Sequence, residues 1–206
     1  MGMKIYLTRH GQDKDNANGI LNGHRDEPLT SVGISQAKEL AGRIKKTKIK
    51  FKYVLSSPLQ RAFKTAKIIA KLLEIKEPKK LILLIERDFG IMTGKSHSKI
   101  LEMCSPNVIV ADKVNYFLCP KGAETFPQLL KRAKRLLSYV FKNYKNGNVL
   151  LVSHGDLGKM IYAAYYNLDW KQVLKMFHFG NSDLILLSKD CKPEKAHIFK
   201  TKQYNK

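Results

Sequence analysis

The chain has 206 residues, 44% of them apolar, and it carries 38 Lys and Arg against 17 Asp and Glu, a net charge of +21. This length predicts a single domain over residues 1–206, and the apolar runs are too short for a membrane-spanning helix or a signal peptide, so we expect a cytoplasmic protein. Only seven basic residues are Arg, and the lysines are scattered over helix faces. Because nucleic-acid sites depend on Arg, the charge does not favour nucleic acid as a partner, although its field would attract small anions.

Short apolar runs alternate with longer amphipathic stretches along the chain. Thr30 and Ser31 are cap candidates for one helix, and Ser57, followed by Pro58, is the expected N-cap of the next. The segment Met92–Cys119 is expected to be irregular apart from one short helix. In chain order, the sequence predicts a strand over Met3–Thr8, a helix over Thr30–Lys46, a strand over Tyr53–Leu55, a helix from Ser57 to Leu73, a strand over Leu81–Ile85, helices over Ser98–Met103 and Glu124–Lys145, a strand over Val149–Val152, helices over Leu157–Tyr166 and Asp169–Phe177, and strands over Leu184–Leu187 and His197–Phe199.

This alternation predicts an α/β fold: a three-layer α/β/α sandwich around a mostly parallel central sheet. In such folds ligands bind beyond the carboxyl ends of the strands. Four polar clusters directly follow predicted strands: Arg9-His10, Ser56 to Arg61, Glu86 and Ser153-His154. We therefore expect these clusters to meet at one edge of the sheet.

These residues form a set that is complete for phosphoryl transfer. The transferred group spreads negative charge over its oxygens, so it requires cationic donors, an in-line nucleophile and an acid for the leaving oxygen. Arg9, Arg61 and His154 are candidate donors, His10 is the candidate nucleophile and Glu86 is the candidate acid. We expect no metal and no other cofactor in this site.

The segment Leu-Thr-Arg-His-Gly at residues 7–11 resembles the opening signature of the histidine phosphatase superfamily, which includes phosphoglycerate mutases and acid phosphatases. Further blocks are similar to that family in the same order, so that the resemblance extends from about residue 3 to 188. They are residues 26–37, residues 56–66 around Arg61, Glu86-Arg87-Asp88-Phe89-Gly90 and Val152-Ser153-His154-Gly155. The resemblance implies a phosphoglycerate mutase-like fold.

The resemblance also implies a role for each catalytic residue. Neutral His10 would attack phosphorus with one ring nitrogen while its other nitrogen donates to a backbone carbonyl. Arg9, Arg61 and a partly protonated His154 would bind the phosphoryl oxygens. Glu86 would protonate the leaving oxygen and later deprotonate water, for which its pKa must be raised.

Additional residues are expected to bind substrate. Asn16 stands where the family often has a phosphate-contacting Asn, and Asn22 and Gly23 are expected to donate hydrogen bonds to substrate. The family commonly has Glu where this chain has Gln12, which removes one charge beside the site. The segment Met92–Cys119 is expected to cover the pocket.

The resemblance leaves phosphatase and mutase as alternatives. The acid block differs from the Glu-Arg-His-Tyr-Gly of mutases, residues 122–126 resemble a Gly-Gly-Glu-Ser stretch of the phosphatase branch, and the chain is short for a mutase. The sequence therefore favours a metal-independent phosphatase that acts on small phosphorylated molecules, with a phosphoglycerate mutase (an isomerase) as the alternative. A non-catalytic phospho-ligand or nucleic-acid binding protein on the same fold is an alternative of another class, and an oligomer is left open.

The other histidines and the cysteines are not expected to take part in catalysis. Four histidines are expected to be packed or surface side chains: His24, His97, His178 and His197. Three cysteines form neither a zinc pattern nor a disulfide framework and are expected to be free thiols: Cys104, Cys119 and Cys191.

Overall fold

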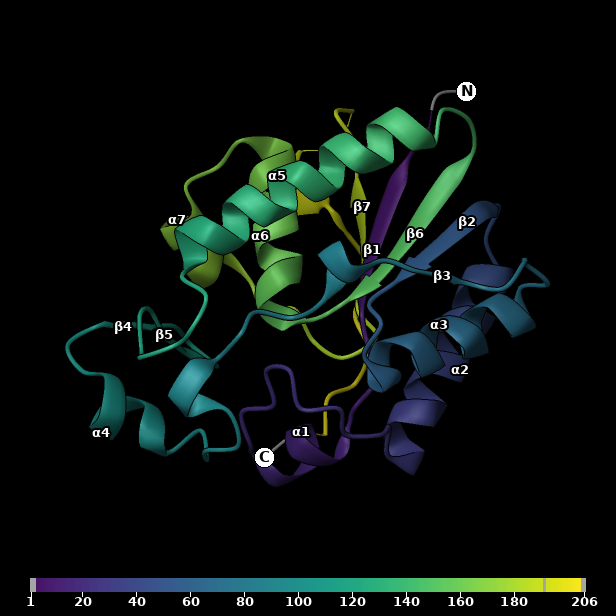
Figure 1. Cartoon of the computed structure of the whole chain (residues 1–206). Coiled ribbons are helices and arrows are strands. Elements are labelled where there is room, and N and C mark those ends of the chain that lie inside the picture. Colours follow the sequence, from purple (N-terminus) through teal and green to yellow (C-terminus); the bar gives the residue numbers. More distant parts are fainter. Residues whose placement is uncertain (1–2, 191, 205–206) are drawn as a thin grey trace.

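The computed structural model describes residues 3–190 and 192–204, and its centre is a six-stranded sheet of order β3-β2-β6-β1-β7-β8 (Figure 1). The pairs β3-β2, β2-β6 and β6-β1 are parallel, whereas β7 and β8 run antiparallel at one side. The expected mostly parallel sheet is therefore confirmed. Its strands are β1 (Ile5–Arg9), β2 (Phe51–Ser56), β3 (Lys79–Lys80), β6 (Asn148–Ser153), β7 (Leu184–Leu187) and β8 (His197–Phe199).

Helices cover both faces of this sheet and complete the three expected layers (Figure 1). Successive residues of a strand point to opposite faces, and β6 shows this directly. Val149 and Leu151 pack in one core cluster with residues of α5 (Phe126–Asn143), α6 (Gly155–Tyr166) and α7 (Trp170–Met176). Leu150 and Val152 pack in the other, with residues of α2 (Ser31–Lys45) and α3 (Gln60–Leu72).

Local capping sets the start of two of these helices. Thr30 is the N-cap of α2, and its hydroxyl accepts a hydrogen bond from the Gly33 amide at 3.1 Å. Thr125 caps α5 in a reciprocal capping box with Gln128. Both caps satisfy amide groups that have no partner within the helix, which explains why these helices begin where they do.

The strand predicted over Leu81–Ile85 is wrong. Only β3 continues the ladder, and the chain then forms a 3₁₀ turn over Ile82–Leu84. The carbonyl groups that a strand would pair are bound by side chains instead: Arg132 donates to Leu83 and Ile85, and the Ser153 hydroxyl donates to Leu84. The apolar content of this segment does not reveal that side chains take the place of a neighbouring strand.

Other expectations need smaller corrections. Helix α3 begins at Gln60 with Leu59, and not Ser57, as its N-cap. The Ser57 hydroxyl accepts from the Leu59 amide at 3.3 Å and lies 2.8 Å from His154 Nε2. The short helix α4 (Lys99–Cys104) is confirmed. The sequence missed α1 (Lys14–Asn18) and the hairpin formed by β4 (Val108–Val110) and β5 (Asn115–Phe117).

None of the helices in the described residues has the length and apolar character that crossing a bilayer requires. Cys104 and Cys119 are free thiols, as expected. Cys191 lies outside the described residues.

Candidate active site

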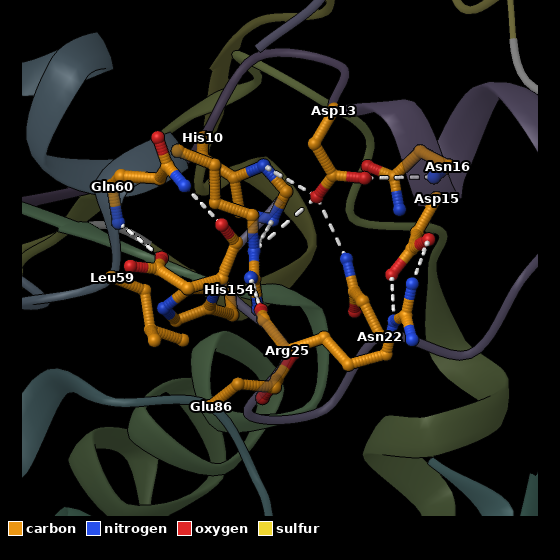
Figure 2. Close-up of polar contacts among 12 residues, drawn as sticks. His10, Asp13, Asp15, Asn16, Asn22, Arg25, Leu59, Gln60, Glu86 and His154 are labelled. Atoms are coloured by element: carbon orange, nitrogen blue, oxygen red, sulfur yellow. Dashed lines mark hydrogen bonds and ion pairs between the residues drawn. The ribbon is translucent and has the colours of Figure 1, made fainter. Parts of the chain in front are cut away.

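The parallel strands bring the predicted residues together at their carboxyl ends. His10 directly follows β1, Arg61 lies in the first turn of α3 after β2, and His154 is the N-cap of α6 after β6. The rings of His10 and His154 lie side by side (Figure 2), with their centroids 5.1 Å apart. Arg61 Nε lies 3.3 Å from His10 Nε2. Residues separated by more than 140 positions in the chain therefore form one cluster.

His10 is held in a single orientation. Its Nδ1 lies 2.7 Å from the Gly11 carbonyl oxygen, as the neutral tautomer with a proton on Nδ1 requires, and this leaves the Nε2 lone pair to accept from Arg61. Burial, and then the charges of Arg61 and Arg9, hold the pKa of His10 well below its ordinary value. The ring is therefore neutral at pH 7, as an attacking nitrogen must be.

The tight turn after His10 requires glycine. A Cβ on Gly11 would lie 2.3 Å from the Gly33 carbonyl oxygen, which no side chain tolerates. The Gly11 amide donates to the hydroxyl of Thr65 at 3.0 Å, which ties this turn to α3. The backbone therefore fixes His10 from both neighbouring helices, α2 and α3.

His154 is fully buried, and its Nε2 lies 2.8 Å from the Ser57 hydroxyl. Burial, and then the positive charges around it, hold the pKa of His154 well below its ordinary value. The charges of the protein itself therefore favour a neutral ring, whereas the partial protonation expected from the sequence applies to a ring beside a phosphate and stays a prediction. A phosphate dianion beside the ring would act in the opposite sense and raise this pKa.

Arg61 is fully buried, and its guanidinium is bound on several sides. It donates to the carbonyl groups of Gly23, at 2.8 Å, and Arg25, and its Nε lies 3.3 Å from Asp13 Oδ2. The Gly23 carbonyl thus orients Arg61, and donation from Gly23 to substrate stays a prediction. Burial lowers the pKa of Arg61 against the opposing effect of Asp13.

Asp13 is a site residue that the sequence interpretation missed (Figure 2). It is completely buried, its Oδ1 accepts from the Asn16 amide at 2.7 Å, and its Oδ2 accepts from Asn22 Nδ2 at 2.7 Å. Its Oδ2 also lies 3.8 Å from His10 Nδ1. An Asp at a helix N-cap is a recognisable sequence signal, but its contact with His10 and Arg61 depends on the fold.

A pocket of about 670 Å³ opens beside these buried groups. Four of the predicted residues line it: Arg9, Asn16, Asn22 and Glu86. Arg9 donates to the Phe179 carbonyl at 3.1 Å, and Asn16 Oδ1 accepts from Asn181 Nδ2 at 3.1 Å. The segment expected to cover the pocket contributes residues 97, 100 and 111–116 to the lining.

Glu86 lies against the N-terminus of α6. Its Oε1 accepts from the amides of Arg87, at 2.8 Å, and Leu157, at 3.1 Å. Burial, and then the nearby charge of Asp156, raise the pKa of Glu86 despite these hydrogen bonds. This is the direction that a proton donor requires.

The loop that carries Glu86 is held by two buried or half-buried arginines. Arg87 pairs with Asp156 at 2.8 Å. Arg132 pairs with Glu124 at 2.6 Å and donates to the Glu86 carbonyl at 3.1 Å. Asp156 therefore supports this loop through Arg87.

The remaining histidines differ in position. His97 and His178 line the pocket, so their interpretation as merely packed or surface residues is incomplete. His24 Nε2 lies 2.8 Å from the Glu86 carbonyl, and His197 packs on the ring of Phe177. Within residues 3–190 and 192–204, no group of three or more His, Cys, Asp or Glu side chains is placed to hold a metal ion.

Comparison with known proteins identifies relatives that share this fold. A metal-independent phosphoserine phosphatase of Arabidopsis thaliana is 34% identical over 161 residues, which cover 77% of this chain and 67% of the relative. A 2,3-bisphosphoglycerate-dependent phosphoglycerate mutase of Rhizobium etli is 31% identical over 156 residues, 74% of this chain and 75% of the relative. The relatives thus include both phosphatases and mutases.

A solved structure of a phosphatase is also similar to this chain. Phosphoserine phosphatase of Entamoeba histolytica in complex with 3-phosphoglyceric acid is 27% identical, with a TM-score of 0.70 and 89% of each chain covered. The model of the histidine phosphatase superfamily (branch 1) matches residues 5–198, nearly the whole chain. This chain belongs to the histidine phosphatase superfamily.

Proposed function

We propose that this protein is a metal-independent phosphatase that hydrolyses phosphate monoesters of small anionic molecules through a phosphohistidine on His10. One observation carries the proposal: Nδ1 of His10 lies 2.7 Å from the Gly11 carbonyl oxygen, which leaves the Nε2 lone pair of a neutral imidazole facing the guanidinium of Arg61. An imidazole in this state is a nucleophile that needs no further activation.

Two steps follow from this arrangement. First, Nε2 of His10 bonds to phosphorus as the ester P–O bond breaks, and Glu86 gives its proton to the departing oxygen. Arg9, Arg61 and His154 stabilise the charge on the phosphoryl oxygens. Second, Glu86 takes a proton from water, whose oxygen bonds to phosphorus as the N–P bond breaks.

A phosphoglycerate mutase is the second candidate, and the relative from Rhizobium etli supports it. In a mutase a substrate hydroxyl, and not water, would take the phosphoryl group from His10. The relatives from Arabidopsis thaliana and Entamoeba histolytica that are named phosphoserine phosphatases favour hydrolysis, as do the short chain and the residues 122–126.

The test is phosphate release from p-nitrophenyl phosphate and a panel of phosphate monoesters in the presence of a metal chelator. We expect turnover, and we expect His10→Ala to abolish it while a His197→Gln control remains active. Isomerisation of phosphoglycerate is followed in parallel, and isomerisation without phosphate release would identify a mutase. Salt-dependent nucleic-acid binding with neither activity would indicate a binding protein.

A further inference from the structure

Three lysine or arginine side chains are buried in the described part of the chain: Arg61, Arg87 and Lys159. The two arginines each have a carboxylate partner, Asp13 at 3.3 Å and Asp156 at 2.8 Å. Lys159 is only 2% exposed and forms no ion pair with any described carboxylate. A buried charge without a counter-charge is costly, so Lys159 requires an explanation.

The described neighbours of Lys159 accept two hydrogen bonds from its ammonium group but form no ion pair with it. Its Nζ donates to the carbonyl groups of Leu174, at 2.8 Å, and Val173, at 3.2 Å. The rings of Tyr116 and Phe177 lie 5.1 and 4.9 Å away. Burial lowers the pKa of Lys159 to about 8, against the opposing effect of Asp156, so the ammonium is still largely charged at pH 7.

Lys159 lines the substrate pocket, beyond the phosphoryl-binding end. Gly155, at the start of α6, also lines the pocket, and four residues of helix place Lys159 about 6 Å further along the axis. A second cavity of about 410 Å³ adjoins the pocket there, and both are lined by Lys113, Tyr116 and His178.

Cationic side chains lie at both ends of the pocket, although Glu86, Asp112 and Asp156 also line it. Burial, and then the charges of Arg9, Lys159 and Lys113, lower the pKa of His178 to about 4. His178 therefore lies within reach of cations from both ends of the pocket. An anion bound beside Lys159 would supply a negative counter-charge for its ammonium group.

We propose that Lys159 is the counter-charge for a second anionic group of the substrate, a carboxylate or a second phosphate, in a subsite formed with Lys113, Tyr116 and His178. The transferred phosphoryl group is bound by Arg9 and Arg61, so Lys159 serves a different part of the same molecule. The substrate class is therefore a compact phosphate monoester with a second negative group a few bonds away. This inference rests on the proposed function and names the substrate class of that site.

Matched substrates test the subsite in the unmodified protein. The pairs are 3-phosphoglycerate against glycerol 3-phosphate, phosphoserine against phosphoethanolamine, and glucose 1,6-bisphosphate against glucose 6-phosphate. We expect kcat/KM to favour the member with the additional carboxylate, or with the additional phosphate, by about tenfold or more. Equal values within all three pairs would overturn the proposal.

Lys159→Met removes the charge, and Lys131→Met, at an exposed position of α5, is the matched control. We expect Lys159→Met to reduce the kcat/KM ratio within each pair to about one, whereas Lys131→Met should leave the wild-type ratio unchanged. An unchanged preference in a folded variant would contradict the proposal. If the variant does not fold, the wild-type ratios decide.

Turnover of p-nitrophenyl phosphate separates the two hypotheses, because its absence would count against the phosphatase and not against the subsite. In that case calorimetric binding of the same pairs to His10→Ala protein tests the subsite directly. Tighter binding of 3-phosphoglycerate than of glycerol 3-phosphate would support it, and equal binding would overturn it.

Discussion

His10 lies beside the ion pair of Arg61 and Asp13. Arg61 Nε is 3.3 Å from its Nε2, and Asp13 Oδ2 is 3.8 Å from its Nδ1. The Gly11 carbonyl oxygen, 2.7 Å from Nδ1, holds the proton there and so keeps the lone pair on Nε2, the nitrogen that faces Arg61. Before His10 can attack phosphorus, the Arg61 N–H must release this lone pair and donate to a phosphoryl oxygen instead.

Asp13→Asn should destabilise the protein strongly, because it leaves the guanidinium of Arg61 buried without its carboxylate. We expect a loss of about 3 kcal/mol in the free energy of unfolding, measured by urea titration. Inorganic phosphate should restore more stability to this variant than to the wild type, because it supplies the missing anion. Glu74→Gln, which breaks the exposed pair with Lys45, should cost less than about 1 kcal/mol, and equal losses would refute this account.

Glu86→Gln should slow the hydrolysis of alkyl phosphates far more than that of p-nitrophenyl phosphate, because the p-nitrophenolate leaving group needs no protonation. We expect a loss of about 100-fold or more in kcat/KM for glycerol 3-phosphate. Because burial raises the pKa of Glu86 above its ordinary 4.5, the alkaline limb of the wild-type profile should lie above pH 4.5, where Glu86 loses its proton. The pH profile of the variant should lack that limb, and an unchanged limb would assign it to another group.

At the scale of elements, the conformation of the loop around Glu86 could not be predicted from local sequence. The apolar run Leu81–Ile85 predicts a strand, but Arg132 on α5 binds the carbonyl groups of Leu83, Ile85 and Glu86. Such a contact joins segments that are 46 to 49 positions apart, so no local pattern reports it. By contrast, Thr30 and its helix were predictable because a cap and its amide partner are neighbours in sequence.

Arg132→Met tests whether this anchor positions Glu86. We expect kcat for an alkyl phosphate to fall about tenfold or more while KM changes little, because the acid loses its position and the binding residues keep theirs. The loss should be smaller with p-nitrophenyl phosphate. Arg135→Met, at an exposed position of the same helix, is the control, and similar losses in both variants would argue against a positioning role.

At the scale of the whole molecule, the resemblance in the sequence blocks predicted the fold and the cluster of His10, Arg61 and His154. It did not predict Asp13 or Lys159, whose importance depends on which side chains surround them once the chain has folded. A single domain over residues 1–206 and a cytoplasmic location stay predictions. The net charge of +21 belongs to the molecule as a whole.

A positive field accelerates the encounter with anionic substrates and is screened by salt. We therefore expect kcat/KM for 3-phosphoglycerate to fall several-fold between about 20 mM and about 500 mM sodium chloride, with kcat nearly unchanged. Steady-state kinetics across this range measures both. A kcat/KM that does not depend on salt would show that the charge has no role in capture.

The central claim is that the phosphoryl group passes through Nε2 of His10. Rapid quenching of the enzyme with a labelled phosphate monoester at alkaline pH, where phosphohistidine survives, followed by peptide mapping, locates the label directly. We expect one phosphoryl group on the peptide that contains His10, and none in His10→Ala protein. Label on another residue, or turnover with no labelled enzyme at any time point, would contradict the account.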